Sequence, residues 1–185
     1  MGVYKFGKLT GEMEEPFVYP NAWAREKTTG PERLVIAPSA NHVTLLLDLA
    51  KRLPEPFGIL YVLVVSRGGN EPGRYQTPSP IVRSDMEQFV SGFSNYFEGD
   101  GRHHIWIASI PESATLVYDH HNVIFAYGPL EAYSEVVRRK GLIEGAVNFP
   151  VPHTHRYNKE YDQDEQRIFL RWEWKRFPLE NADEY

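Results

Sequence analysis

One apolar run, Phe57 to Ser66 with the sequence FGILYVLVVS, constrains the fold of this chain more than any other segment. Its residues are almost all apolar, and many are β-branched or aromatic, which favours a strand over a helix. The run is far shorter than the roughly 18 to 20 apolar residues of a membrane-spanning helix. We therefore predict a strand that is covered on both faces, as the central strand of a sheet.

The segment from Ser84 to Gly99 carries the strongest helix signals in the chain. It opens with SDME, a capping box in which the serine hydroxyl and the glutamate carboxylate satisfy free backbone amides. Apolar residues then recur at helical spacing, and Gly99 is placed to end the helix in a left-handed conformation. The apolar face consists of Met86, Phe89, Val90, Phe93, Tyr96 and Phe97.

Shorter patterns predict the other elements. Leu34 to Ala37 is a short apolar strand, and the leucines of residues 46–53 recur at helical spacing up to Pro54. Gly128 and Pro129 open a third helix, which has basic residues near its end and stops at Gly141. Between these helices, alternation predicts an antiparallel meander of three strands. These are His104 to Ile110, Thr115 to Tyr118 and Val123 to Tyr127.

The two ends of the chain carry weaker patterns. Residues 1–30 are rich in Gly, Pro, Asn and charge, so we expect an irregular N-terminal arm with at most a short strand from Val3 to Lys8. Arg167 to Lys175 alternates like a strand, but it follows an acidic helix start at Asp162 to Glu165. We therefore predict a C-terminal helix there. Residues 177–185 are expected to be a frayed tail.

The predicted elements follow the order β-α-β-α-β-β-β-α, which is typical of an α+β fold. We predict a single domain over residues 31–176, with a mixed, mostly antiparallel sheet of about five strands and with helices packed mainly on one face. The turn after the first strand, APSAN at residues 37–41, contains no glycine. A dinucleotide-binding fold is therefore not expected.

Composition narrows the classes of partner. The chain of 185 residues has a formal net charge of −5 and no cysteine. Binding to nucleic acid or to a membrane is not expected, because no basic stripe is present to neutralise phosphates. The lack of cysteine removes disulfides, thiolate metal ligands and cysteine nucleophiles, and the first residues lack the apolar core of a secretory signal. We therefore expect a cytoplasmic protein.

Two histidines follow an acid in YDHHNV, residues 118–123. Asp, His and Asn tolerate turn conformations, so the simplest interpretation of residues 119–122 is the tip of a hairpin. The same side chains, Asp119, His120 and His121, could instead bind a divalent metal or move protons. Because adjacent residues of a strand point to opposite faces, we expect this loop to supply at most two ligands.

A second histidine pair lies at His153 and His155. In an extended segment the two rings share a face, and an H-x-H pair is a recurring way to place two imidazoles on one metal. The alternative to an ordered loop is therefore a zinc or manganese site in a hydrolase whose metal activates a water molecule. Its ligands would be Asp119, His120 or His121, His153 and His155.

The connection from Arg67 to Arg83 is long for a compact domain, and connections of this length are often binding loops. The alternative to a binding loop is a mobile loop that has no binding role. The glycines of residues 68–73 lack the Lys-Ser/Thr ending of a phosphate loop, so nucleotide binding is not expected there. Side chains of types that recognise partners occur in this loop, namely Arg67, Arg74, Tyr75 and Gln76.

The motifs GxSxG, HExxH and SxxK do not occur in the sequence, and we assign no catalytic residue. Aromatic and arginine side chains in loops are the composition that interface hot spots favour. We therefore predict a non-catalytic, cytosolic protein-binding module without a cofactor, immunity-protein-like in kind, although no motif assigns the chain to that family. It would bind a protein partner through loop 67–83 and the hairpin tip, with His120 and His121. The sequence indicates neither the partner nor the oligomeric state.

Overall fold

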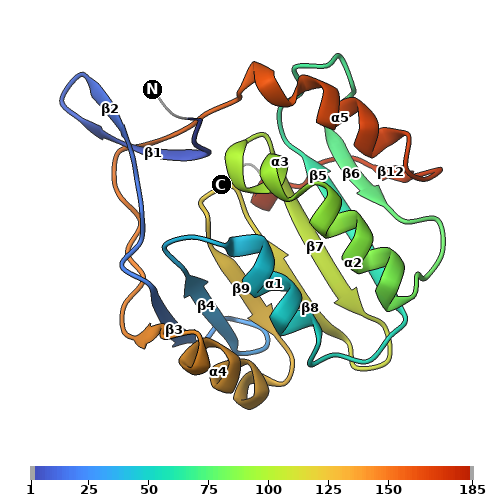
Figure 1. Cartoon of the computed structure of the whole chain (residues 1–185), viewed down its shortest axis with the longest axis horizontal. Coiled ribbons are helices and arrows are strands. Elements are labelled where there is room, and N and C mark those ends of the chain that lie inside the picture. Colours follow the sequence, from blue (N-terminus) through green and yellow to red (C-terminus); the bar gives the residue numbers. More distant parts are fainter. Residues whose placement is uncertain (1–2, 184–185) are drawn as a thin grey trace.

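A nine-stranded sheet runs through the computed structural model, which describes residues 3–183 (Figure 1). Its strands are β3 (Ala22–Glu26), β4 (Arg33–Ala37), β5 (Phe57–Leu63), β6 (Gly73–Gln76), β7 (His103–Ser109), β8 (Ala114–Tyr118), β9 (Ile124–Tyr127), β10 (Ile143–Glu144) and β12 (Lys175–Phe177). They lie in the order β10-β3-β4-β9-β8-β7-β5-β6-β12. Only the β10–β3 pair is parallel within the described residues, so the sheet is mixed and mostly antiparallel, as expected.

The predicted number of about five strands is wrong. The five predicted strands correspond to β4, β5, β7, β8 and β9, and the last three form the expected antiparallel meander. The strands that the sequence did not reveal are short or polar, and they extend the sheet at its edges by backbone pairing, without an apolar alternation. Nor is β5 central, because β8 occupies the middle of the order. One face of β5 is only partly covered, with Gly58 and Leu60 half-buried.

The helices of the domain pack on one face of this sheet. They are α1 (His42–Ala50), α2 (Arg83–Gly92), α3 (Ser94–Gly99), α4 (Leu130–Arg139) and α5 (Asp162–Phe169). Figure 1 shows α1 to α4 in front of the sheet, which agrees with the prediction that one face carries the helices. The helix expected to start at Ser84 is divided at Phe93, whose φ of −113° and ψ of 17° leave the helical region just after Gly92, a poor helix former.

Side chains of the meander alternate between the two faces of the sheet. Leu116 and Tyr118 of β8 are fully buried in the core under the helices. Thr115 and Val117 line a cavity on the opposite face, which α1 to α5 do not cover. The domain therefore has a helix-covered face that forms the core and a helix-free face that is partly open.

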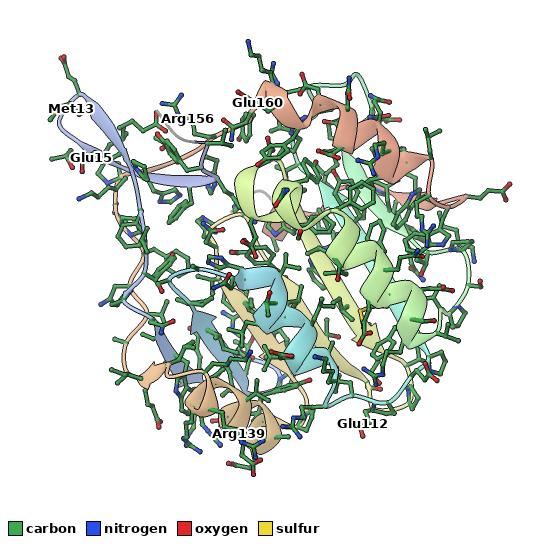
Figure 2. The ribbon with its side chains drawn as sticks, in the orientation of Figure 1. Met13, Glu15, Glu112, Arg139, Arg156 and Glu160 are labelled. Carbon is green, nitrogen blue, oxygen red and sulfur yellow. The ribbon has the colours of Figure 1, made fainter. Side chains whose placement is uncertain are left out.

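The N-terminal arm is more regular than expected. It contains β1 (Phe6–Thr10) and β2 (Met13–Pro16), which pair as a hairpin, and then β3. The hairpin projects from the body of the molecule, with Met13 and Glu15 near its far end (Figures 1 and 2). On its other edge β1 pairs with β11 (His153–His155), which completes a separate three-stranded sheet. Through this pairing the arm positions the second histidine segment.

The C-terminal segment also differs from the expectation. Helix α5 ends at Phe169, so most of the helix predicted over Arg167 to Lys175 does not form. The chain turns because the ring of Trp174 packs near Phe89 and its Nε1 donates to the carbonyl oxygen of Ile168 at 3.0 Å. Part of the tail expected to be frayed is ordered as the end of β12 and as the short 3-10 helix η2 (Asn181–Asp183), while residues 184–185 lie outside the described residues. None of the described helices is long and apolar enough to cross a membrane.

Candidate metal centre

The turn between β8 and β9 is held by the carboxylate of Asp119. Its Oδ1 accepts hydrogen bonds from the backbone amides of His121 (2.9 Å) and Val123 (3.1 Å). Its Oδ2 lies 2.8 Å from Nδ1 of His121. With Nδ1 engaged as the donor, the other ring nitrogen of His121 is left with an open lone pair, which is the arrangement by which carboxylates orient metal-binding histidines.

The turn is a hairpin tip, as its composition predicts, but it is buried. Asp119, His120 and His121 are only 5%, 4% and 8% exposed. The two histidine rings do not point to opposite faces, because the chain curls at this position and Asn122 adopts a left-handed conformation with φ of 63°. The ring centroids of His120 and His121 lie only 4.3 Å apart. Both rings of this loop therefore face one centre.

Strand β11 brings the second histidine pair to the same place. His155 pairs with Phe6 of β1, and its ring centroid lies 4.0 Å from that of His120 and 4.8 Å from that of His121. His153 shares the face of His155, as the H-x-H spacing predicts, with the two ring centroids 5.3 Å apart. His153 is more exposed, and its Nδ1 lies 3.1 Å from the carbonyl oxygen of Pro150. It therefore lies at the edge of the cluster.

Three imidazoles are close enough to hold one ion. His120, His121 and His155 each offer a ligand nitrogen, and these three atoms lie within 4.8 Å of one another. Nitrogen ligands of a tetrahedral zinc ion are about 3.3 Å apart when each Zn–N bond is about 2.0 to 2.1 Å. Zinc binding would therefore require the three nitrogens to move closer together than this 4.8 Å limit. The structure thus brings together three of the five expected metal candidates as ligands, with Asp119 behind them and His153 beside them.

The cluster contains polar atoms that have lost water without gaining a partner. Nε2 of His120 and Nδ1 of His155 are buried and make no hydrogen bond within residues 3–183. Burying such a nitrogen without a partner costs about 1 to 3 kcal/mol, so unpartnered buried groups are rare in folded proteins. A bound cation would satisfy both nitrogens at once.

The rings of His120 and His155 are held in the neutral form that binds metals. Burial lowers the pKa of His155 to about 3, with a further contribution from the neighbouring histidines His121 and His153. Burial likewise lowers the pKa of His120 far below its usual range, and His104 and His155 add to this effect. Neutral imidazole has a free lone pair, so protons do not compete with a cation for these nitrogens near neutral pH.

His104 belongs to the same cluster, although we expected it only as the beginning of a strand. Its ring centroid lies 4.4 Å from that of His120, and its buried Nε2 has no hydrogen-bond partner in the described part of the chain. The pairing of Ile105 with Tyr118 places His104 beside Asp119 at the end of the meander. Combining the predicted hairpin register with the alternation of side chains would have revealed this neighbour.

A cavity of about 650 Å³ opens from the histidine cluster onto the helix-free face of the sheet. His104, Asp119, His121 and His153 line one end of it. A cavity of this size is in the range that accommodates small-molecule ligands. None of its wall residues outside the cluster was predicted from the sequence. They include Arg33, Trp106, Phe125, Tyr127 and Phe149.

The residues of loop 67–83 that we expected to bind a partner do not line this cavity. Part of this connection is strand β6, in which Tyr75 is buried and Gln76 is exposed. Arg67 donates to Asp162 at 3.0 Å, and Arg74 holds Asp183 through two hydrogen bonds of 2.8 and 2.9 Å. The arginines of this segment therefore tie the C-terminal part of the chain to the sheet.

Comparisons with protein-family models, with curated proteins and with solved structures found no match to this chain. What the chain can do is therefore inferred from its own side chains.

Proposed function

We propose that this chain is a metal-dependent hydrolase with a zinc ion bound by His120, His121 and His155. The observation that carries the proposal is the convergence of three imidazoles, two buried and one half-buried, of which His120 and His155 present buried nitrogens without a partner in the described residues. An all-imidazole ligand set suits zinc better than manganese, which prefers oxygen ligands. Of the two metals that the sequence suggested, zinc and manganese, we therefore choose zinc.

The number of ligands supports a catalytic centre over a structural one. Structural zinc sites are closed by four protein ligands, whereas catalytic sites have three protein ligands and keep one position open. Here the three-histidine set adjoins a cavity through His121, one of its own members. Substrate could therefore approach the open position from the cavity.

The surrounding side chains have separable tasks in this proposal. Zinc on three histidines lowers the pKa of a bound water to about 7, which supplies a nucleophile at neutral pH. Asp119 fixes the tautomer and orientation of His121 through the 2.8 Å contact. His104, with its unpartnered Nε2 beside His120 and the cavity, can accept a hydrogen bond from the attacking water.

The test is hydrolysis of an aryl ester and an aryl phosphate, p-nitrophenyl acetate and p-nitrophenyl phosphate, by protein loaded with one equivalent of zinc. We expect the loaded wild type to hydrolyse at least one of them faster than buffered zinc, and the His155→Ala variant to lose about 100-fold or more of that rate. His42→Ala, which replaces another buried histidine outside the cluster, should keep the activity. Zinc-loaded protein that hydrolyses neither compound above the buffered-zinc rate would contradict the proposal.

A non-catalytic partner-binding role is the competing hypothesis, and the exposed side chain of Gln76 together with the 40% exposed side chain of Arg67 favours it. It makes a different prediction. Changing Arg67 and Gln76 to alanine would reduce recovery of a protein partner in a pull-down, whereas the hydrolase proposal expects no effect of these changes on ester hydrolysis.

A further inference from the structure

The cavity beside the histidine cluster has an aromatic wall along the sheet. Trp106 of β7 and Phe125 and Tyr127 of β9 line it from the sheet, and Phe149 lines it from the segment before β11. Aromatic rings make favourable edge-to-face and offset-stacked contacts with other flat rings. The wall therefore suits a flat aromatic body more than a small polar ligand.

The cavity is elongated along β8. Thr115, Val117 and Asp119 follow one another on its floor, because alternate residues of a strand share a face. Four residues of extended chain span about 13 Å, which sets the distance from the histidine end to the opposite end. A ligand that fills the cavity must therefore be longer than a single aromatic ring.

The two ends of the cavity carry opposite charges. Asp119 and Asp183 line the histidine end, and Arg33 lines the other end beside Tyr127 and Thr115. The side chain of Arg33 is 24% exposed, and its guanidinium lies 4.1 Å from the centroid of the Phe125 ring. Asp183 is paired with Arg74, so Asp119 is the carboxylate that disfavours an anion at the histidine end, whereas Arg33 favours one at the other end. This difference sets the direction of a ligand that has one anionic group.

Arg33 keeps hydrogen-bonding capacity for such a group. Its Nε donates to Glu26 at 2.6 Å and its Nη1 to the Tyr127 hydroxyl at 2.7 Å. These bonds hold the guanidinium in place on the ring of Phe125 and use two of its five N–H donors. Glu26 is 47% exposed, so water screens its charge more than it screens the charge of Arg33. A planar carboxylate matches the donors that remain.

We propose that the cavity binds an elongated aromatic carboxylate, with its carboxylate at Arg33 and its aromatic body between Trp106 and Phe125. In this orientation the far end of the ligand reaches the histidine cluster. The identification of this ligand as a substrate rests on the proposed hydrolase, since the bond to be cleaved would lie at that far end. Binding of the ligand itself does not require the metal.

The experiment uses metal-free protein and two matched probes, biphenyl-4-carboxylate and the neutral biphenyl-4-carboxamide, with calorimetric measurement of both dissociation constants. We expect the carboxylate to bind about tenfold more tightly than the carboxamide, the effect of one hydrogen-bonded charge. Arg33→Gln should bring the two constants to within about twofold of each other. Arg25→Gln, which removes an arginine from the neighbouring strand β3, should leave the ratio unchanged.

Equal binding of the two probes to the wild type, or no binding of either at millimolar concentration, would overturn the proposal. An equal effect of Arg25→Gln and Arg33→Gln would also overturn it, because the preference would then come from overall charge. Because the protein is metal-free, this result is independent of zinc binding and hydrolysis. Selective carboxylate binding by a chain without hydrolase activity would leave this inference standing and remove only the proposed function.

Discussion

Two buried polar clusters of this protein, one around Arg102 and one around His120, differ in how their groups are satisfied. Arg102 is fully buried, and its five N–H donors face Asp100, Asp162, Glu165 and a backbone carbonyl at 2.6 to 3.1 Å. In the histidine cluster, three ring nitrogens are buried without a partner among residues 3–183. Arg102 and His120 are 0% and 4% exposed, so the contrast does not come from the burial of these two side chains.

The comparison teaches what each cluster contributes. The arginine network is complete within the chain and joins α5 to the loops around β7, which is a structural task. The histidine cluster is incomplete within the chain, and the missing partner must accept several nitrogen lone pairs at one point. A divalent cation fits that requirement. The following predictions test the contrast, beginning with the largest expected effect.

Replacing the centre of the complete network should be severely destabilising. Arg102→Met leaves the carboxylates of Asp100 and Glu165 buried without their cation, and we expect a loss of about 3 to 5 kcal/mol in the free energy of unfolding. Arg139→Met removes an exposed arginine at the molecular surface (Figure 2) and should change stability by less than about 0.5 kcal/mol. Urea denaturation of both variants measures the difference. Similar losses in the two would mean that the network is not structural.

Acid should weaken the fold through buried histidines that lack partners, with His42 as a case outside the metal cluster. Burial lowers the pKa of His42 to about 3, opposed by Asp119 and reinforced by Lys5. The unfolded chain, with a histidine pKa of about 6.5, binds this proton more readily than the folded chain. The free energy of unfolding therefore falls as the pH is lowered from about 6.5 towards 3.

One such histidine contributes up to about 1.4 kcal/mol per pH unit to the slope of the free energy of unfolding against pH. His42→Phe keeps a ring to stack on Tyr118, whose centroid lies 5.4 Å away, and should flatten the dependence by up to this amount. Denaturation curves between pH 6.5 and 4.5 measure it. A variant whose stability depends on pH as steeply as that of the wild type would show that His42 is protonated in the folded chain.

Removing a ring nitrogen from the incomplete cluster should cost little in metal-free protein. His155→Phe deletes a buried nitrogen without a partner and keeps an aromatic ring beside Phe6 and His120. We expect the free energy of unfolding to rise by less than about 1 kcal/mol, because an unsatisfied buried polar atom is removed. A loss comparable to that of Arg102→Met would mean that the histidines stabilise one another and need no ion.

Periodic patterns predicted the centre of the domain well and its margins poorly. The strands of the meander and α4 follow apolar spacings that local sequence reveals. Strands β6, β10 and β12 are held by pairing with distant partners, and nothing in their own residues requires an extended conformation. Likewise, Asp183 is buried because Arg74, which is distant in sequence, donates two hydrogen bonds to its carboxylate. Tertiary pairing of this kind leaves no local signal.

The candidate site was predictable in its parts. The composition of YDHHNV and the H-x-H spacing identified the histidines, and the hairpin interpretation of residues 119–122 is correct. What the sequence could not supply was the pairing of β1 with β11, which places His155 against His120. It also led us to expect that His120 and His121 would diverge, because the rule for strands does not apply to a turn.

Metal content after loading is the most direct test of the central claim that His120, His121 and His155 form a metal centre. Protein purified without chelator is given one equivalent of zinc, passed through a desalting column and assayed by elemental mass spectrometry. We predict about one zinc per wild-type chain, retention of that zinc by His42→Ala, and its loss from a His121→Ala/His155→Ala double variant. A wild-type chain that emerges without zinc, or a double variant that retains as much as the wild type, would contradict the account.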